Sequence, residues 1–544
     1  MPKPAVQPPP GGNPYLWLVT TAHHDPQRPF IEQPDGTLLS YGRMLELTES
    51  IGAALHARSV RAGDRVVAQV DKSPQAVALY LACLKVGAVF VPLNTAYTLA
   101  ELEYFLTDAA PRLAVVRPET ASDVLAIARG ARVEHVATLG RDCDGEAKPA
   151  GGAASSAGVS PLIRGGISPS AAGASGGAGT AIPAPSTLAA LLYTSGTTGR
   201  SKGAMLSQAN LATNALALTN AWRFTARDVL LHALPIFHVH GLFVAINCVL
   251  ASGSAMLFLP KFDASEVVRL LPRASVLMGV PTFYTRLLQH PGFTRERTRG
   301  MRLFVSGSAP LLADTHREFQ ERTGHAILER YGMSETLMNT SNPYEGARVP
   351  GSVGPALPDV ELRITAPDTG TPLCGADRVG MIEVRGPNVF SGYWRMPEKT
   401  AAELRPDGWF ITGDLGRIDE RGYVWIVGRG KDLIISGGYN VYPIEVEAEI
   451  DALPGVLESA VVGLPHADFG EAVTAIIVPR AGARLDESAM RSALEQRLAR
   501  YKLPKRLLFI DELPRNTMGK VQKGALRERY RGLYDAARPG RLQE

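Results

Sequence analysis

The segment from Tyr193 to Gly203 (YTSGTTGRSKG) has the residue types needed to bind phosphate groups. Its glycines let successive backbone N–H groups point into one concavity, its hydroxyls add donors without bulk, and Lys202 supplies a compensating charge. The apolar run at 188–193 predicts a strand immediately before this loop. We therefore expect phosphate contacts from Thr194, Ser195, Gly196, Thr197, Thr198, Gly199 and Lys202.

Two other loop chemistries fit this segment less well. A nucleotide-binding P-loop requires glycine immediately before its lysine, and Ser201 occupies that position. Residues 199–203 match the G-x-S-x-G elbow of serine hydrolases, but that serine directly follows a strand, and here the polar residues 194–200 intervene. The sequence therefore disfavours a hydrolase with Ser201 as nucleophile, for which reaction with a fluorophosphonate probe would be diagnostic.

Six further motifs follow the loop in a fixed order. They are PIFHVHG at 235–241, SGSAPL at 306–311, YGMSET at 331–336, GWFITGDLG at 408–416, GRGKD at 428–432 and PRNTMGKVQK at 514–523. Together with the loop they resemble the adenylate-forming superfamily of acyl-CoA synthetases, luciferases and adenylation domains. The resemblance covers nearly the whole chain apart from residues 145–186 and the two tails. Finer detail, including YWRMPEKT at 393–400, is similar to the malonyl-CoA synthetases within that superfamily.

The resemblance implies a two-step reaction, in which a carboxylate attacks the α-phosphate of ATP and a thiol then attacks the acyl-adenylate. Both steps build negative charge, so cations and N–H donors are needed where it develops. Lys520 is then the catalytic lysine of a mobile C-terminal domain, Glu335 the Mg²⁺ ligand, and Ser334 a hydroxyl bonding the α-phosphate. Asp414, in a predicted glycine-flanked turn, would accept both ribose hydroxyls. The remaining ATP contacts implied are Ser308, Ala309, Pro310, Tyr331, Gly332, Met333 and Arg429.

The same resemblance makes Lys431 the hinge residue, since small neighbouring residues absorb large φ/ψ changes. Gly437 and Gly438 would let the pantetheine arm of coenzyme A approach the backbone. Lys502 and Lys505 are weaker candidates for its phosphates.

Fewer residues are candidates for selecting the acid substrate than for binding ATP. A dicarboxylate carries a second charge, which arginine can bind bidentately. Arg286 lies on a predicted helix that is otherwise apolar on that face, and the resemblance implies that it holds the distal carboxylate of malonate. Ser306 or Ser308 would support it, His238 would line the pocket, and Met333 would limit room beside the α-carbon.

Composition limits the other possibilities. The chain has 544 residues, 45% of them hydrophobic, and a net charge of +4, which argues against disorder and against nucleic acid as the main partner. Its four cysteines lie at no zinc-binding or disulfide spacing. The N-terminus has no signal-peptide pattern, and the uncharged run 229–260 is better explained as buried core than as a membrane span. We expect a cytoplasmic protein.

The elements that must position these residues alternate between strands and helices, which predicts an α/β protein with parallel layers. We expect an N-terminal ATP- and acid-binding domain at 1–430, with a β-rich part at 351–427, and a small α+β C-terminal domain at 431–544. Residues 145–186, rich in Ala, Gly, Ser and Pro, would be a surface insertion without its own core.

The sequence thus predicts an enzyme that ligates malonate to coenzyme A, using ATP and Mg²⁺ and releasing AMP and pyrophosphate. Methylmalonate or a small or medium monocarboxylate are alternative acids. A luciferase-like oxygenase and a non-catalytic nucleotide-binding protein are alternatives of other classes. An amino-acid adenylation module would need an acidic residue near 237–238 and a following carrier domain, and neither is visible. The motifs leave the oligomeric state open.

Overall fold

The computed structural model describes residues 12–140, 159–163, 182–194, 201–437, 439–466, 468–516 and 519–534. Its first sheet has seven strands, which are parallel except for the last. Their order is β7 (Val159–Pro161), β6 (His135–Thr138), β5 (Leu113–Val116), β3 (Arg65–Gln69), β4 (Val89–Pro92), β8 (Leu188–Thr194) and β9 (Lys202–Ser207).

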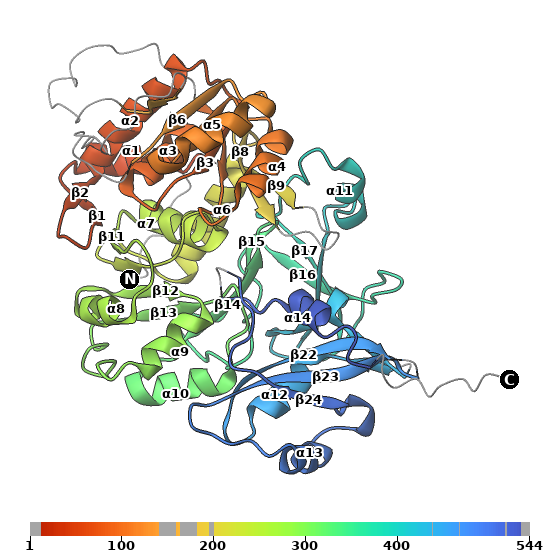
Figure 1. Ribbon diagram of the computed structural model, residues 1–544. Coiled ribbons are helices and arrows are strands. Elements are labelled where there is room, and N and C mark those ends of the chain that lie inside the picture. The colour runs from red at the N-terminus through yellow and green to blue at the C-terminus, as the bar shows by residue number, and fades with distance from the viewer. Residues whose placement is uncertain are drawn as a thin grey trace.

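A second, eight-stranded sheet lies beside the first, with a parallel centre and antiparallel strands at both edges. Its order is β15 (Leu337–Ser341), β14 (Leu328–Met333), β13 (Leu303–Ser306), β12 (Val276–Gly279), β10 (Val229–His232), β11 (Ala255–Phe258), β1 (Pro29–Glu32) and β2 (Leu38–Ser40). In Figure 1 the first sheet is orange to yellow, and the second is green except for its red strands β1 and β2.

Helices cover both sheets and fill the space between them. Helix α3 (Pro74–Val86) is buried nearly all round; Ser73 caps its start, Pro74 occupies its first turn, and Gly87 ends it with a positive φ. The others are α1 (Tyr15–His24), α2 (Tyr41–Ala57), α4 (Leu99–Ala109), α5 (Ala121–Gly130), α6 (Gln208–Ala221), α7 (Asn247–Ser252), α8 (Ala264–Leu270), α9 (Pro281–Gln289) and α10 (Ala313–Thr323).

The uncharged run at 229–260 is core, as predicted. It forms β10, a π-helix (His240–Ile246), α7 and β11, and most of its side chains are buried. Among the described residues, no helix has both the length and the apolar character needed to span a membrane.

Within the predicted surface insertion at 145–186, residues 159–163 join the first sheet and the core. Strand β7 pairs in parallel with β6, and Leu162 is 3% exposed within the main hydrophobic core. The Arg58 guanidinium also donates to Ser160 Oγ and to the Pro161 carbonyl. A short apolar segment inside a low-complexity stretch is sufficient to add an edge strand.

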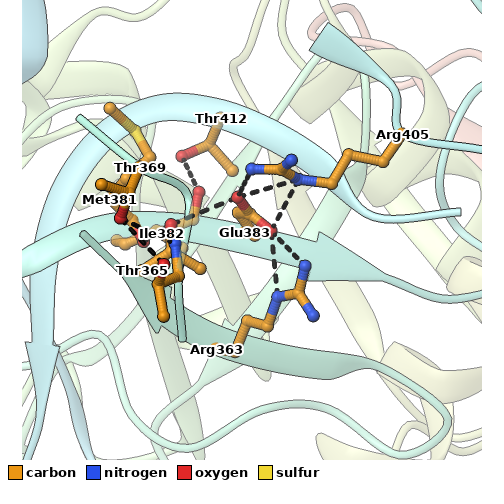
Figure 2. A network of polar contacts seen from close by, with 9 residues as sticks. Arg363, Thr365, Thr369, Met381, Ile382, Glu383, Arg405 and Thr412 are labelled. Carbon is orange, nitrogen blue, oxygen red and sulfur yellow. Dashed lines mark hydrogen bonds and ion pairs between the residues drawn. The ribbon is translucent and has the colours of Figure 1, made fainter. Parts of the chain in front are cut away.

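The predicted β-rich part is a four-stranded antiparallel sheet in the order β16 (Glu361–Thr365), β17 (Gly380–Arg385), β18 (Phe410–Ile418) and β19 (Val424–Arg429). Figure 2 shows how buried Glu383 joins its parts by accepting hydrogen bonds from Arg363, Arg405 and Thr365. Burial alone would raise the pKa of Glu383, but the two guanidiniums hold it below its usual value. The carboxylate therefore stays charged and joins β16, β17 and the segment that precedes β18.

The last part of the chain has its own five-stranded sheet and hydrophobic core. Its strands are β20 (Ile434–Ser436), β21 (Tyr439–Val441), β22 (Val456–His466), β23 (Gly470–Pro479) and β24 (Arg506–Phe509), and its helices are α12 (Pro443–Asp451), α13 (Glu487–Glu495) and α14 (Lys523–Arg529). These blue elements gather below the β16–β19 sheet in Figure 1. The chain is thus a mixed α/β protein, as predicted from its alternating pattern.

Candidate active site

The described ends of the predicted phosphate-binding loop are held by helix α4. The Tyr193 hydroxyl donates to Asp108 Oδ2 at 2.5 Å, and the Tyr104 hydroxyl donates to the Ser201 carbonyl at 2.7 Å. Strands β8 and β9 close the loop as an antiparallel pair with Thr194 opposite Lys202. Five predicted contacts lie outside the described residues: Ser195, Gly196, Thr197, Thr198 and Gly199.

Asp414 is positioned by a strand and not by the predicted turn. It lies within β18, 4% exposed and opposite Arg429 of β19, whose guanidinium is 2.9 Å from its Oδ1. The Tyr331 hydroxyl donates to its Oδ2 at 2.6 Å. Thr412, which Figure 2 shows bonded to Ile382, donates to the Ile382 carbonyl and accepts from the Asp414 N–H.

Lys520 faces this group from the C-terminal part of the chain. Burial and the Arg429 guanidinium lower the pKa of Lys520 to about 8, whereas Asp414 and Asp432 act in the opposite direction. Its neighbour Gly519 packs so closely on α9 that an added Cβ would lie 2.9 Å from Thr282 Oγ1. The structure therefore brings Lys520, Asp414 and Arg429 together.

Glu335 is buried between two hydroxyls. Its Oε1 accepts from the Tyr393 hydroxyl at 3.1 Å and lies 3.5 Å from Thr194 Oγ1. Burial raises the pKa of Glu335, while Lys202 acts to lower it. Ser334 precedes it and is partly buried. The carboxylate is thus placed beside the base of the phosphate-binding loop.

Arg330 of β14 forms the centre of a second polar group. It is 3% exposed, and its Nε and Nη2 have no hydrogen-bond partner among the described residues. Gly307 leaves room for it, because an added Cβ would lie 2.5 Å from the guanidinium carbon. Burial lowers the pKa of Arg330 to about 9, so it remains charged at neutral pH.

Two other buried polar atoms near Arg330, Ser306 Oγ and His240 Nε2, also have no hydrogen-bond partner among the described residues. The other ring nitrogen of His240, Nδ1, lies 3.3 Å from Ser308 Oγ. His238 is partly buried; burial, Arg330 and Lys520 lower its pKa to about 4, so its imidazole is neutral at neutral pH. Unpaired buried groups of this kind are costly unless a ligand completes them. A carboxylate is the ligand that matches the free edge of a guanidinium.

The expected role of Arg286 is not supported. Its side chain is exposed, because the buried face of α9 is formed by Phe283, Tyr284, Leu287 and Leu288. The apolar residues around it in sequence suggested burial, but the helix turns Arg286 to the opposite side.

A lysine between the two large sheets supports the histidine segment. Lys72 Nζ lies 2.8 Å from His232 Nδ1 and 2.9 Å from the His232 carbonyl, and it sits over the Phe258 ring. The other ring nitrogen of His232 then donates to the Gly241 carbonyl at 2.8 Å, which makes its imidazole neutral. The start of the π-helix, and with it the segment 238–240, is fixed by these contacts.

Comparison with known proteins shows the family to which the chain belongs. Residues 18–394 match the AMP-binding enzyme family, and residues 445–520 match the AMP-binding enzyme C-terminal domain. The chain belongs to the AMP-binding enzyme family. Among solved structures, the ATP-bound MatB from Rhodopseudomonas palustris is 56% identical, with a TM-score of 0.88 over 96% of this chain and 100% of that one.

Curated relatives of this AMP-binding enzyme include ligases for several acids. Indoleacetate–CoA ligase of Aromatoleum aromaticum is 35% identical over 94% of this chain and 97% of its own length. Malonate–CoA ligase of Arabidopsis thaliana is 41% identical over 62% of this chain and 60% of its own length. The apo form of the R. palustris MatB aligns with a TM-score of 0.79.

The other predicted site residues of this AMP-binding enzyme lie around the two polar groups or on the C-terminal part. Ser308 has a positive φ and, with Ala309 and Pro310, follows β13; Gly332 and Met333 end β14. Lys431 is exposed in the short helical turn Gly430–Asp432, and Gly437 is exposed with a positive φ. Lys502 pairs with Glu445 at 2.6 Å and Lys505 lies over the Phe469 ring, while Gly438 is outside the described residues.

Sequence reasoning missed Arg330, although it lies beside the YGMSET motif. Arg330 follows the apolar residues Ile327 and Leu328 closely in sequence, and the acidic residue beside it is Glu329. Glu329 instead faces His316 at 3.2 Å, on the other side of the strand.

Proposed function

We propose that this AMP-binding enzyme ligates malonate to coenzyme A through a malonyl-adenylate, with AMP and pyrophosphate as the other products. The observation that carries the proposal is the buried guanidinium of Arg330, whose Nε and Nη2 have no hydrogen-bond partner among the described residues; Arg330 and Lys520 both lower the pKa of His238. A dicarboxylate offers one carboxylate to each cation. A monocarboxylate would leave the charge of Arg330 buried and unpaired.

In the adenylation step, Lys520 would neutralise charge that develops between the attacking carboxylate and the α-phosphate. Ser334 and the phosphate-binding loop residues would donate hydrogen bonds to phosphate oxygens, and Asp414 would accept from the ribose hydroxyls. These roles require side chains that are already in position before the reaction. Arg429, Tyr331 and Thr412 hold Asp414 in this way. Neutral His238 would line the substrate pocket without competing for either carboxylate.

The residues present fit a magnesium ion held jointly by protein and nucleotide. Within the described ranges, no three His, Cys, Asp or Glu side chains are grouped so that they could hold a metal alone. Glu335 would supply one carboxylate oxygen and the nucleotide phosphates the rest, as Mg²⁺ commonly requires. The ion would neutralise phosphate charge there.

For the thioester step, we propose that residues 431–544 rotate about Lys431 and bring Gly437 and Gly438 to the acyl-adenylate. Coenzyme A would then reach the site along this exposed segment. Contacts of its phosphates with Lys502 and Lys505, and a cytoplasmic location, remain predictions.

A substrate panel tests the proposal. Pyrophosphate release would be measured with malonate, methylmalonate, acetate and octanoate, each with and without coenzyme A, and the thioester identified by mass. We expect malonate to give the highest kcat/KM and malonyl-CoA to form. Greater activity on a monocarboxylate would refute the malonate assignment, and light emission with oxygen consumption would favour the luciferase-like alternative.

A further inference from the structure

Lys202, Tyr393 and Glu403 form a buried polar cluster beside Glu335. Lys202 is 8% exposed; its ammonium lies 3.2 Å from the Tyr393 hydroxyl, 3.4 Å from Glu403 Oε2 and 4.2 Å from the centre of the Tyr393 ring. Glu403 ends helix α11 (Pro397–Glu403), which neither catalytic step described above uses.

The cluster is held in place by backbone pairing. The segment 391–394 pairs with β9: the Trp394 N–H donates to the Gly203 carbonyl, and Ser391 and Met205 are joined by a further N–H to carbonyl bond. An isolated bridge between Ala204 and Tyr393 lies between them. The position of Tyr393 beside Lys202 therefore does not depend on the phosphate-binding loop.

Glu403 would keep two other polar partners if Lys202 moved away. Its Oε2 accepts from the Tyr393 hydroxyl at 2.6 Å, and its Oε1 lies 2.7 Å from Lys399 Nζ, one helical turn earlier. The contacts that Lys202 makes, at 3.2 and 3.4 Å, are longer than those of a strong charge-assisted bond. If Lys202 moved toward phosphate, Glu403 would keep a hydroxyl donor and a lysine.

The charges in the cluster balance without a ligand. Two lysines, Lys202 and Lys399, oppose two carboxylates, Glu335 and Glu403. A triphosphate or pyrophosphate bound at the adjacent loop adds negative charge, which attracts Lys202 and repels Glu403. Glu403 and the bound phosphate group therefore compete for the Lys202 ammonium.

We propose that Glu403 is a positioning residue that competes with the nucleotide triphosphate, and with the pyrophosphate product, for Lys202. It holds the lysine in place before ATP binds and takes it back as pyrophosphate leaves. This inference rests on the proposed function for the identity of the anions. Its effect is to weaken ground-state binding of ATP and to speed product release.

The test is the affinity of Glu403→Gln for ATP and for pyrophosphate, measured by isothermal titration calorimetry with Mg²⁺ present. The amide keeps the shape of the side chain but removes its charge. We expect Kd for both ligands to fall about three- to tenfold, the effect of losing one partly buried competing charge. Product inhibition by pyrophosphate should strengthen by the same factor.

Glu398→Gln is the matched control, because Glu398 is exposed on the same helix. It should leave both affinities unchanged. A second variant, Glu403→Asp, keeps the charge but withdraws it from Lys202, and should give a smaller decrease in Kd. Thermal melting would establish that each variant is folded.

Unchanged or weaker ATP binding by folded Glu403→Gln would overturn the proposal, since a purely structural role predicts loss of affinity. The titrations contain no acid substrate, so a failed malonate assignment would leave this result interpretable. Absence of ATP binding by the unaltered chain would instead refute the proposed function.

Discussion

Replacing Arg330 by methionine should remove malonate use while leaving the nucleotide site intact. In the structure, the guanidinium offers two unpartnered groups, Nε and Nη2, to one carboxylate. A hydrogen bond to a charged group contributes about 1.5 kcal/mol or more, so two contribute about 3 kcal/mol. At about 1.4 kcal/mol for each factor of ten, kcat/KM for malonate should fall about 100-fold.

The assay is malonate- and butyrate-dependent pyrophosphate release, together with ATP binding by calorimetry. Methionine fills a similar volume without charge, so butyrate should be used as well as before or better, and ATP affinity should change little. Arg286→Met is the matched control, because the Arg286 side chain is exposed; it should retain malonate kcat/KM within about twofold. The reasoning is refuted if Arg330→Met keeps its malonate activity, or loses malonate and butyrate activity equally.

Further predictions concern other parts of the molecule. Lys520→Ala should abolish pyrophosphate release with malonate but retain thioester formation from supplied malonyl-AMP; equal loss of both would contradict the proposed domain rotation. The catalytic form of Lys520 is the ammonium, and its pKa is lowered to about 8, so adenylation should decline as pH rises through that value. In a pH–rate profile, Lys520→Arg should remove this decline, and a profile shared by both proteins would assign the decline to another group. Gly307→Ala would place a Cβ 2.5 Å from the Arg330 guanidinium carbon, so malonate KM should rise at least about tenfold while ATP affinity is retained. Leu162→Ala should reduce the free energy of unfolding by about 2–5 kcal/mol in urea titrations, because Leu162 is buried in the core; a change below about 0.5 kcal/mol would show that β7 is dispensable.

Much of the fold could be predicted because its elements carry strong local patterns. Helix α3 has a serine cap, a first-turn proline and a glycine stop, and the core strands are continuous apolar runs. Strand β18 was missed because glycines and Asp414 interrupt its alternation. Its pairing with β17 and β19, together with the Thr412 and Glu383 contacts, outweighs the turn preference of those residues.

Candidate site residues could be selected from the sequence only where the type of residue and its motif were sufficient to suggest a role. The glycine- and hydroxyl-rich loop and the motif residues Glu335, Asp414 and Lys520 could be selected from sequence. Arg330 and Arg286 could not be distinguished, because both have apolar residues nearby in sequence and only the direction of each side chain separates them. Strand β14 directs one into the interior, whereas α9 directs the other to solvent.

The pairing of Asp414 with Arg429 has a consequence for how the two halves of the reaction are timed. Arg429 is the last residue of β19, and the proposed hinge residue, Lys431, follows two positions later. A nucleotide bound at Asp414 would therefore contact the end of β19, and a rotation of residues 431–544 would begin at that same end. Thermodynamic linkage then requires reciprocity: the factor by which ATP shifts the equilibrium toward the adenylating orientation equals the ratio of ATP affinities of the two orientations. A substitution that favours the adenylating orientation should therefore raise ATP affinity by no more than that factor. Nucleotide affinity can thus serve as a measure of hinge equilibrium in this enzyme.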